Sequence, residues 1–259
     1  AYAVVTNGQA YLVDFGPGVV RRASALSPSW GGKFQEMEIE NLQYAFLTHL
    51  HSDHSAGLSD LILSPWVLGR ENSLKLFGPR GLKNMARNIT KAYIEDIDYR
   101  INGSQPSNSE GFKTSVTEIS EGIIFEDENV LVEAFLNNHG GFKNSFGFIF
   151  RTQDKKIVFS GDTAYSEKLI ELSSKADILV HEVYSEKGFL EKTTDWQIYH
   201  KAHHTSAIDV GKIAKLSQPK KLILSHILFW GNTESSIIKE VRQNYDGEVV
   251  IAEDLMVVD

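Results

Sequence analysis

The chain has 259 residues, of which 42% are hydrophobic, so it can form one large domain or two small ones with a sizeable core. Its 34 acidic residues outnumber its 26 lysines and arginines, and the formal net charge of −8 argues against a broad basic surface for non-specific nucleic-acid binding. Cysteine is absent, which excludes disulfides and thiolate metal ligands, and no run of about 18 uncharged apolar residues could span a membrane.

The N-terminal part of the chain predicts a β-hairpin and two further strands. Residues 3–5 and 11–13 flank Asn7-Gly8, a two-residue turn typical of hairpins. Apolar runs predict the further strands over 42–47 and 74–77.

The middle of the chain predicts one helix and one long loop. Leu82, Met85, Ile89 and Tyr93 recur at spacings of three and four, which indicates an amphipathic helix whose apolar side packs on the core. Residues 96–115 are polar and rich in turn residues, so we expect a loop there, either a mobile connection or a substrate lid.

The remaining sequence alternates predicted strands and helices without repeats or linkers. We therefore expect a single α/β domain over residues 1–259. The predicted strands cover 122–125, 130–135, 146–151, 156–160, 177–180, 222–224 and 248–252, and the predicted helices cover 166–175, 205–216 and 233–244.

A dense group of potential metal ligands follows the strand predicted over 42–47. His49, His51, Asp53 and His54 lie within six residues, although the whole chain has only 9 histidines. Imidazole and carboxylate suit zinc and, less selectively, iron or manganese. In an extended segment His49 and His51 project to the same side, and a following helix lets Asp53 and His54 face a second metal. A polar loop rich in histidine by chance is the weaker explanation.

The same arrangement recurs where other predicted strands end. A histidine or aspartate follows the apolar run in each of Thr48-His49, Asn138-His139, Gly161-Asp162 and Ser225-His226. A single strand-end histidine is usually a surface or capping residue. Strand ends along one sheet edge converge, however, so four of them predict one shared site.

The order His-x-His-x-Asp-His, then His, then Gly-Asp-Thr, then His resembles the metallo-β-lactamase superfamily over nearly the whole chain. The resemblance implies an α/β fold, the αββα four-layer sandwich, with two metal ions. Zinc is expected, and manganese or iron would also suit the ligands. By this resemblance the first metal is held by His49, His51 and His139, the second by Asp53, His54 and His226, and Asp162 bridges the two.

Two more segments are similar to the ribonuclease Z and arylsulfatase branch. His181-Glu182-Val183-Tyr184 is similar to that branch's His-Glu-Ala-Thr segment, and His204-Thr205-Ser206 to its His-Ser-Thr segment. The similarity implies that Glu182 and His204 form a catalytic pair beside the metals. A structural ion pair is the alternative role for Glu182.

The chain also departs from the ribonuclease Z pattern. That enzyme usually carries a long arm rich in glycine, proline and lysine that grips the tRNA elbow. Here the interval between His139 and Asp162 predicts only a plain hairpin. The family also normally begins with a strand and a Gly-Thr-Gly-type turn upstream of the position of Ala1, so we expect a missing or abbreviated N-terminal segment.

The resemblance implies a hydrolytic mechanism. Two metals about 3.5–4 Å apart share a water and lower its pKa to about 7. Asp53 is expected to orient the resulting metal-bound hydroxide, and His204, held by Glu182, to protonate the leaving oxygen. Such a proton donor favours a phosphodiester or a sulfate ester over an activated lactam.

We therefore expect a dinuclear zinc hydrolase of phosphodiester bonds that is similar to ribonuclease Z but lacks its arm. The alternatives are an arylsulfatase or another ester, lactone or β-lactam hydrolase, an iron-dependent persulfide oxygenase, and a non-catalytic scaffold. The expected partner is a small ester or a nucleic-acid end, with no membrane, and a homodimer is common in the resembling family. The compartment stays open between the cytoplasm and, after removal of a signal peptide before Ala1, the periplasm or the exterior.

Aromatic residues near the predicted strand ends could line a substrate groove. Trp230, four residues after His226, is the one we favour. The full set is Trp66, Tyr165, Tyr184, Phe229 and Trp230.

Overall fold

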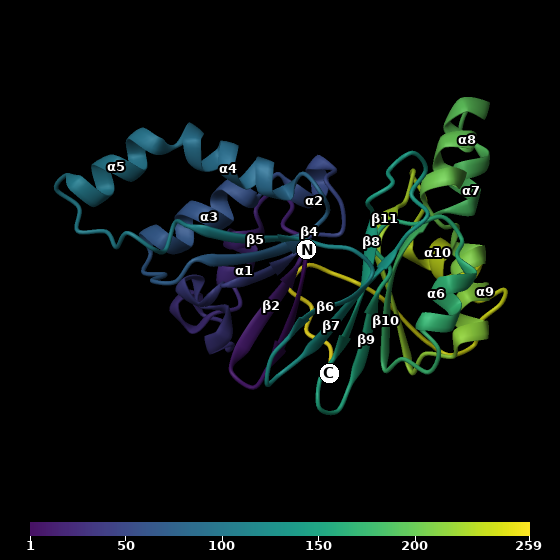
Figure 1. Ribbon diagram of the computed structural model, residues 1–259. Helices are drawn as coiled ribbons and strands as arrows, with labels where there is room; N and C mark the ends of the chain where they lie inside the picture. Colours follow the sequence, from purple (N-terminus) through teal and green to yellow (C-terminus); the bar gives the residue numbers. More distant parts are fainter. The chain divides into compact units, whose positions relative to one another are not determined.

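The computed structural model describes residues 1–259, which form two compact units (Figure 1). Unit 1 comprises residues 1–119 and 254–259, and unit 2 comprises residues 120–253. Each unit has its own β-sheet with associated helices. The single domain expected over 1–259 stays a prediction. None of the helices is both long and apolar enough to cross a lipid bilayer.

Unit 1 is built on a five-stranded sheet in which the strands follow chain order. The first two strands are antiparallel and the others are parallel. Asn7 and Gly8 have positive φ values of 47° and 81°, as a tight hairpin turn requires, so the predicted hairpin is confirmed. The strands are β1 (Tyr2–Thr6), β2 (Gln9–Val13), β3 (Tyr44–Phe46), β4 (Leu74–Gly78) and β5 (Thr114–Glu118).

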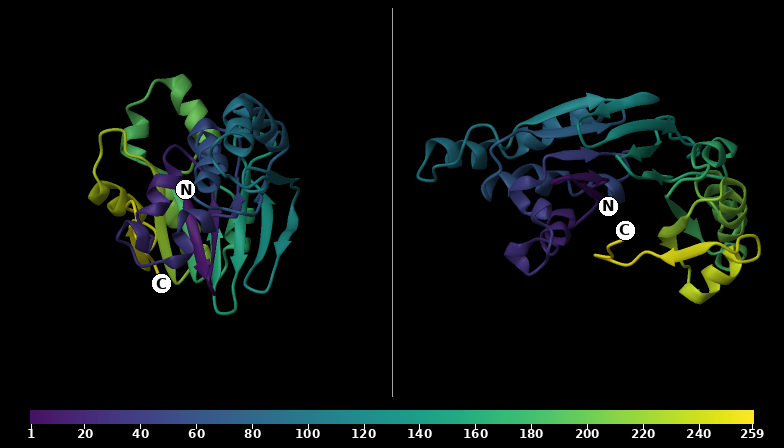
Figure 2. Two further views of the ribbon diagram at one scale, coloured as in Figure 1. Left: turned by 90° about the vertical axis from the view of Figure 1, so that its left-hand side faces the viewer. Right: turned by 90° about the horizontal axis from the view of Figure 1, so that it is seen from below.

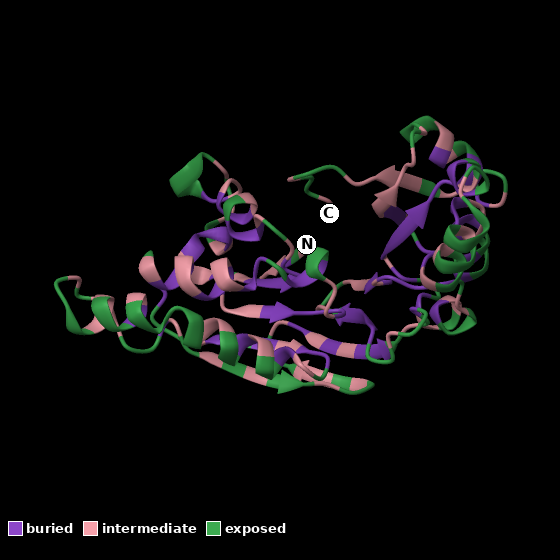
Figure 3. Ribbon diagram, turned by 90° about the horizontal axis from the view of Figure 1, so that it is seen from above, coloured by how far each residue is buried: buried purple, intermediate pink, exposed green.

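Helices of unit 1 bury one face of this sheet. Leu12, Ala45 and Leu76 are register partners in adjacent strands and belong to one core with apolar residues of the helices. Figure 3 shows buried residues concentrated in the inner strands of the sheet, whereas the edge strand β5 and the outer sides of the helices are mainly intermediate or exposed. The helices are α1 (Val19–Ser24), α2 (Ser52–Ser55), α3 (Leu58–Val67), α4 (Leu82–Ala92) and α5 (Ile94–Asn102), and single 3₁₀ turns cover Pro28–Trp30, Gln35–Met37 and Ile39–Asn41.

The predicted amphipathic helix is confirmed as α4, but the loop expected over 96–115 is partly wrong. Its first part belongs to α5, where the Asp96 carboxylate accepts from the Arg100 guanidinium one turn later, at 2.9 Å, and so supports a helix. The remaining loop is tied down by buried Arg70, which donates to the carbonyl oxygens of Gly111 and Leu42 among others. Burial lowers the pKa of Arg70 to about 10, so the guanidinium stays charged at neutral pH.

Unit 2 has a seven-stranded sheet in the order β12-β11-β10-β9-β8-β7-β6. Strands β6 to β9 run antiparallel to their neighbours in the chain, whereas β9 to β12 run parallel. The strands are β6 (Gly122–Glu126), β7 (Leu131–Leu136), β8 (Phe146–Arg151), β9 (Lys156–Phe159), β10 (Ile178–Tyr184), β11 (Lys221–Leu228) and β12 (Glu248–Ile251).

Helices α6, α9 and α10 of unit 2 contribute to the core on the parallel half of its sheet, whereas α8 has no buried residue. Leu179 and Leu222 are register partners, and they share a core with Val210 and Ile213 of α9. Figure 2 shows these helices, coloured green to yellow, gathered beside that part of the sheet. The helices are α6 (Glu167–Leu172), α7 (Glu186–Leu190), α8 (Thr194–His203), α9 (Ala207–Ser217) and α10 (Glu234–Val241).

Two strands of unit 2 continue past the polar residues at which we expected them to end. Strand β10 includes His181 and Glu182, and β11 includes His226. The register passes from the pair Glu182–Ser225 directly to Val183–Ile227, so His226 sits in a bulge with φ +46°. A bulge admits one extra residue and redirects its side chain without ending the strand.

Candidate active site

The histidine cluster of unit 1 lies where β3 leads into the short helix α2. His51 is the residue that precedes α2, and Asp53 and His54 lie in its single turn. Nε2 of His49 is 2.8 Å from Nδ1 of His51, and Nε2 of His54 is 3.4 Å from Oδ2 of Asp53. The segment between β3 and α2, together with the single turn of α2, therefore gathers four potential ligands in one small region.

Asp14, directly after β2, orients this cluster and was missed by the sequence reasoning. Its carboxylate accepts from Nδ1 of His54 at 2.7 Å and from the Thr48 backbone N–H at 2.8 Å. Burial alone would raise the pKa of Asp14, but attraction to His54 and these hydrogen bonds outweigh it and hold the pKa below its ordinary value. The sequence does contain a signal for Asp14, because this acidic residue follows an apolar strand, as Asp162 does.

Unit 2 holds the other three predicted ligands. Oδ2 of Asp162 lies 3.6 Å from Nε2 of His226. Nδ1 of His139 lies 2.8 Å from the His203 carbonyl oxygen, so Nε2, on the opposite side of the ring, points away from that carbonyl group. Gly161 sets the position of Asp162, because at its φ of +59° an added Cβ would lie 2.4 Å from the Phe146 carbonyl oxygen.

Glu182 and His204 lie together in unit 2, as predicted. Oε2 of Glu182 is 3.5 Å from Nδ1 of His204, and Oε1 accepts from the Thr205 backbone N–H at 2.7 Å. Nδ1 of His204 is also 3.8 Å from Oδ2 of Asp162. Burial and then repulsion from Asp162 raise the pKa of Glu182 well above its ordinary value.

His181 is separated from this pair by the alternation of side chains along β10. Leu179 and Val183 belong to the helix-covered core, so His181 between them points to the same side and Glu182 to the other. His181 is fully buried, and burial lowers its pKa to about 4. It is therefore a neutral core residue rather than a member of the polar cluster.

The donor geometry within each unit fits first-row divalent metals. Two ligands about 2.0–2.1 Å from a tetrahedral zinc lie about 3.3–3.4 Å apart. The pairs His54–Asp53 at 3.4 Å and His226–Asp162 at 3.6 Å match this separation. The two ring nitrogens of His49 and His51, 2.8 Å apart, would have to move slightly apart to bind one ion. Nδ1 of His54 and of His139 each face a carboxylate or carbonyl oxygen, the usual support of metal-bound histidine.

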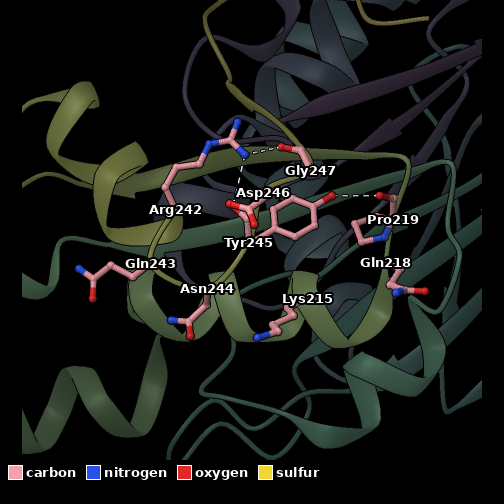
Figure 4. A pocket seen from close by; sticks show the side chains of 9 residues that line it. All are labelled: Lys215, Gln218, Pro219, Arg242, Gln243, Asn244, Tyr245, Asp246 and Gly247. Carbon is pink, nitrogen blue, oxygen red and sulfur yellow. Dashed lines mark hydrogen bonds between the residues drawn. The ribbon is translucent and has the colours of Figure 1, made fainter.

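A surface cavity of about 480 Å³ in unit 2 contains none of the predicted site residues (Figure 4). Pro219 and Gly247 of its lining precede β11 and β12, so the cavity lies at the opposite end of the parallel strands from His226. Arg242 and the Tyr245 hydroxyl at its wall donate to backbone carbonyls. These groups are therefore engaged in holding the loop rather than arranged for catalysis.

The aromatic residues expected to line a groove divide into different environments. Trp66 lies inside α3, buried, and donates to the Asn108 carbonyl oxygen, so it is a core residue and does not line a groove. Phe229 packs against the core of unit 2. Trp230 and Tyr184 contact each other, with ring centroids 5.4 Å apart.

Comparison with known proteins gives consistent matches. A family model described as the beta-lactamase superfamily domain matches residues 9–227. Ribonuclease Z of Mycobacterium sp. (strain KMS) is 29% identical over 228 residues, which are 87% of this chain and 76% of that protein. The crystal structure of human tRNase Z, short form, superposes with a TM-score of 0.71 at 22% identity and covers 99% of this chain and 90% of its own. The metallo-beta-lactamase fold protein YhfI from Bacillus subtilis has a TM-score of 0.70 at 19% identity, covering 97% and 88%.

Proposed function

Because the chain belongs to the beta-lactamase superfamily, we propose that it hydrolyses phosphodiester bonds with the help of two divalent metal ions. The fold class expected from the sequence, an α/β fold of the metallo-β-lactamase type, is confirmed. The expected enzyme class, a metal-dependent hydrolase, is confirmed as well. The type of bond, the metal and the roles of individual residues are the substance of the proposal.

The proposed metal ligands are the seven residues named from the sequence. Zinc is the first choice because the set combines imidazole with carboxylate, and manganese or iron would also suit it. When bound, such ions lower the pKa of water and stabilise the negative charge that develops at the attacked centre. One ion would be held by His49, His51 and His139, the other by Asp53, His54 and His226, with Asp162 shared.

The Glu182–His204 pair is the observation that carries the choice of phosphodiester. Glu182 is buried, and its two oxygens face Nδ1 of His204 and the Thr205 N–H. The carboxyl group therefore anchors the loop that carries His204, through the Thr205 N–H, and lies within ion-pair distance of the imidazole. A histidine held in this way can give a proton to a leaving alkoxide, which a phosphodiester needs and an activated lactam does not. We assign Asp53 to accept a proton from the attacking water.

The relatives support a nucleic-acid end or a small phosphodiester as the substrate. Proteins named ribonuclease Z match most of this chain. The interval between His139 and Asp162 contains the hairpin of β8 and β9, as expected from the sequence. Because this interval is short, we expect the protein to bind its substrate mainly near the scissile bond. A homodimer stays a prediction.

The direct test compares turnover of an aryl phosphodiester and an aryl sulfate by the zinc-loaded protein, with and without a chelator. We expect turnover of the phosphodiester, loss of that turnover with chelator, and its return when zinc is added back. Preference for the sulfate would replace the phosphodiester assignment with an arylsulfatase. Turnover that survives removal of zinc, verified by elemental analysis, would contradict the role of the metals.

Replacement of Asp14 by alanine is expected to weaken zinc binding about 10- to 100-fold, the usual cost of losing the support of a metal-bound histidine. The change removes the acceptor that holds Nδ1 of His54 at 2.7 Å. Competition with a chromogenic chelator measures the affinity, and Asp60→Ala, on α3 of the same unit, is the matched control. Unchanged zinc affinity in the Asp14 variant would remove this residue from the metal site.

A further inference from the structure

Helix α8 of unit 2 carries large aromatic side chains into solvent. Together with α7 it forms the connection from β10 to α9, beyond the carboxyl end of the parallel strands (Figure 1). Trp196 is 55% exposed and Tyr199 is 39% exposed. Exposed aromatic groups close to a catalytic centre indicate a binding surface.

Ring contacts connect Trp196 with the proposed proton donor. The ring of His200 lies 5.8 Å from that of His204 and stacks on Trp196 at 5.4 Å, with an angle of 22° between the planes. His200 also contacts Trp230 at 4.5 Å, and the Lys192 ammonium lies 4.8 Å above the Trp230 ring. The surface therefore combines flat apolar rings with a positive charge.

A second series of rings leads from the ligand His139 to Tyr199. His203 lies 5.1 Å from His139 and stacks on Tyr199 at 4.1 Å, with an angle of 21°. Tyr199 in turn lies 5.6 Å from Trp196. Both series start at residues assigned to the reaction centre, and both end at exposed rings on the same helix.

We propose that Trp196 and Tyr199 form a stacking subsite for a base of a single-stranded nucleic acid, beside the scissile phosphodiester. The proposal rests on the proposed function and names its substrate class. Trp196 precedes His203 by seven residues, which is about 10 Å along a helix axis. The ring of His200 stands between those of Trp196 and His204, so a group that stacks on Trp196 must reach beyond the proton donor, as a base carried on its ribose can.

The charge of the surface fits the same occupant. A nucleotide offers a π-face for stacking and an anionic phosphate for Lys192, and stacking of a base on an aromatic side chain accepts any base. An aliphatic partner would use the flat rings less well and would leave the ammonium group without a counter-charge.

Calorimetric binding of adenosine 5′-monophosphate to the protein as isolated tests the subsite, with ribose 5-phosphate and phenyl phosphate as matched probes. We expect adenosine 5′-monophosphate to bind more tightly than both other probes. Trp196→Ala should raise its Kd at least about fivefold, the low end of the stacking effect, and Trp196→Phe should retain most of the affinity. Trp30→Ala, which removes an exposed tryptophan of unit 1, is the control and should change nothing.

Two results would overturn the inference. One is an affinity for adenosine 5′-monophosphate that is undetectable or unaffected by Trp196→Ala, and the other is equally tight binding of phenyl phosphate. The probe is a phosphomonoester and the readout is binding, so the result does not depend on turnover. Binding that depends on Trp196 in a protein without phosphodiesterase activity would contradict the proposed function and leave the subsite standing.

Discussion

Replacement of His204 by alanine is expected to lower kcat for a short oligoribonucleotide about 10²- to 10⁴-fold, the usual contribution of a positioned acid or base. The imidazole is the group beside Glu182 that we assign to protonate the leaving oxygen, and alanine leaves nothing in that place. Steady-state kinetics of the zinc-loaded variant measures the effect. Lys201→Ala, which changes an exposed residue on α8, is the control, and its kcat should stay within about twofold of the parent value.

The dependence on the leaving group separates this role from a general loss of structure. A nitrophenolate needs little protonation, so the His204→Ala penalty should be much smaller for bis(4-nitrophenyl) phosphate than for the oligoribonucleotide. Glu182→Gln should act through the same step, so the double variant should be little worse than His204→Ala alone. Equal penalties for both substrates, or multiplicative effects of the two changes, would contradict a Glu182–His204 unit.

Replacement of Asp162 by alanine should lower turnover of every substrate at least about 10³-fold, because metal ions supply several kcal/mol of charge stabilisation and each 1.36 kcal/mol is tenfold in rate. Asp162 is buried, and its Oδ2 is 3.6 Å from His226 and 3.8 Å from His204. Loss of this carboxylate removes the ligand that we assign to both ions. The zinc content per chain, measured by elemental analysis, should fall in parallel.

The matched control for Asp162 is Asp154→Ala in the turn after β8, where the carboxylate accepts from the nearby Thr152 hydroxyl at 2.9 Å. Circular dichroism should confirm that both variants fold. Full zinc content together with turnover within about tenfold of the parent protein would show that Asp162 is not a shared ligand. A variant that keeps its zinc but loses turnover would place Asp162 in the chemistry and not in metal binding.

Local patterns in the sequence were sufficient where one segment determines its own geometry. The cluster from His49 to His54 lies within six consecutive residues that end in the helical turn of α2, so its members are close together because they are neighbours in the chain. The β1–β2 hairpin likewise follows from Asn7-Gly8, which adopt the positive φ values that a tight turn requires.

Local patterns were insufficient where a neighbouring strand or a covering layer decides the conformation. Strand β10 was expected to end at its first polar residues, yet His181 is accommodated in the helix-covered core and Glu182 on the other face. The bulge at His226 depends on the register between β10 and β11, and no feature of the isolated segment specifies that register.

The sequence by itself determined the superfamily, the enzyme class and the identity of the candidate ligands, because metal chemistry restricts these positions to a few residue types in a recognisable order. Only the tertiary structure identified Asp14 as the support of His54, oriented Glu182 towards His204, and brought the ring of His203 on α8 next to His139. These contacts join residues distant in sequence. They arise from strand register and core packing, which depend on the whole sheet and not on any one segment.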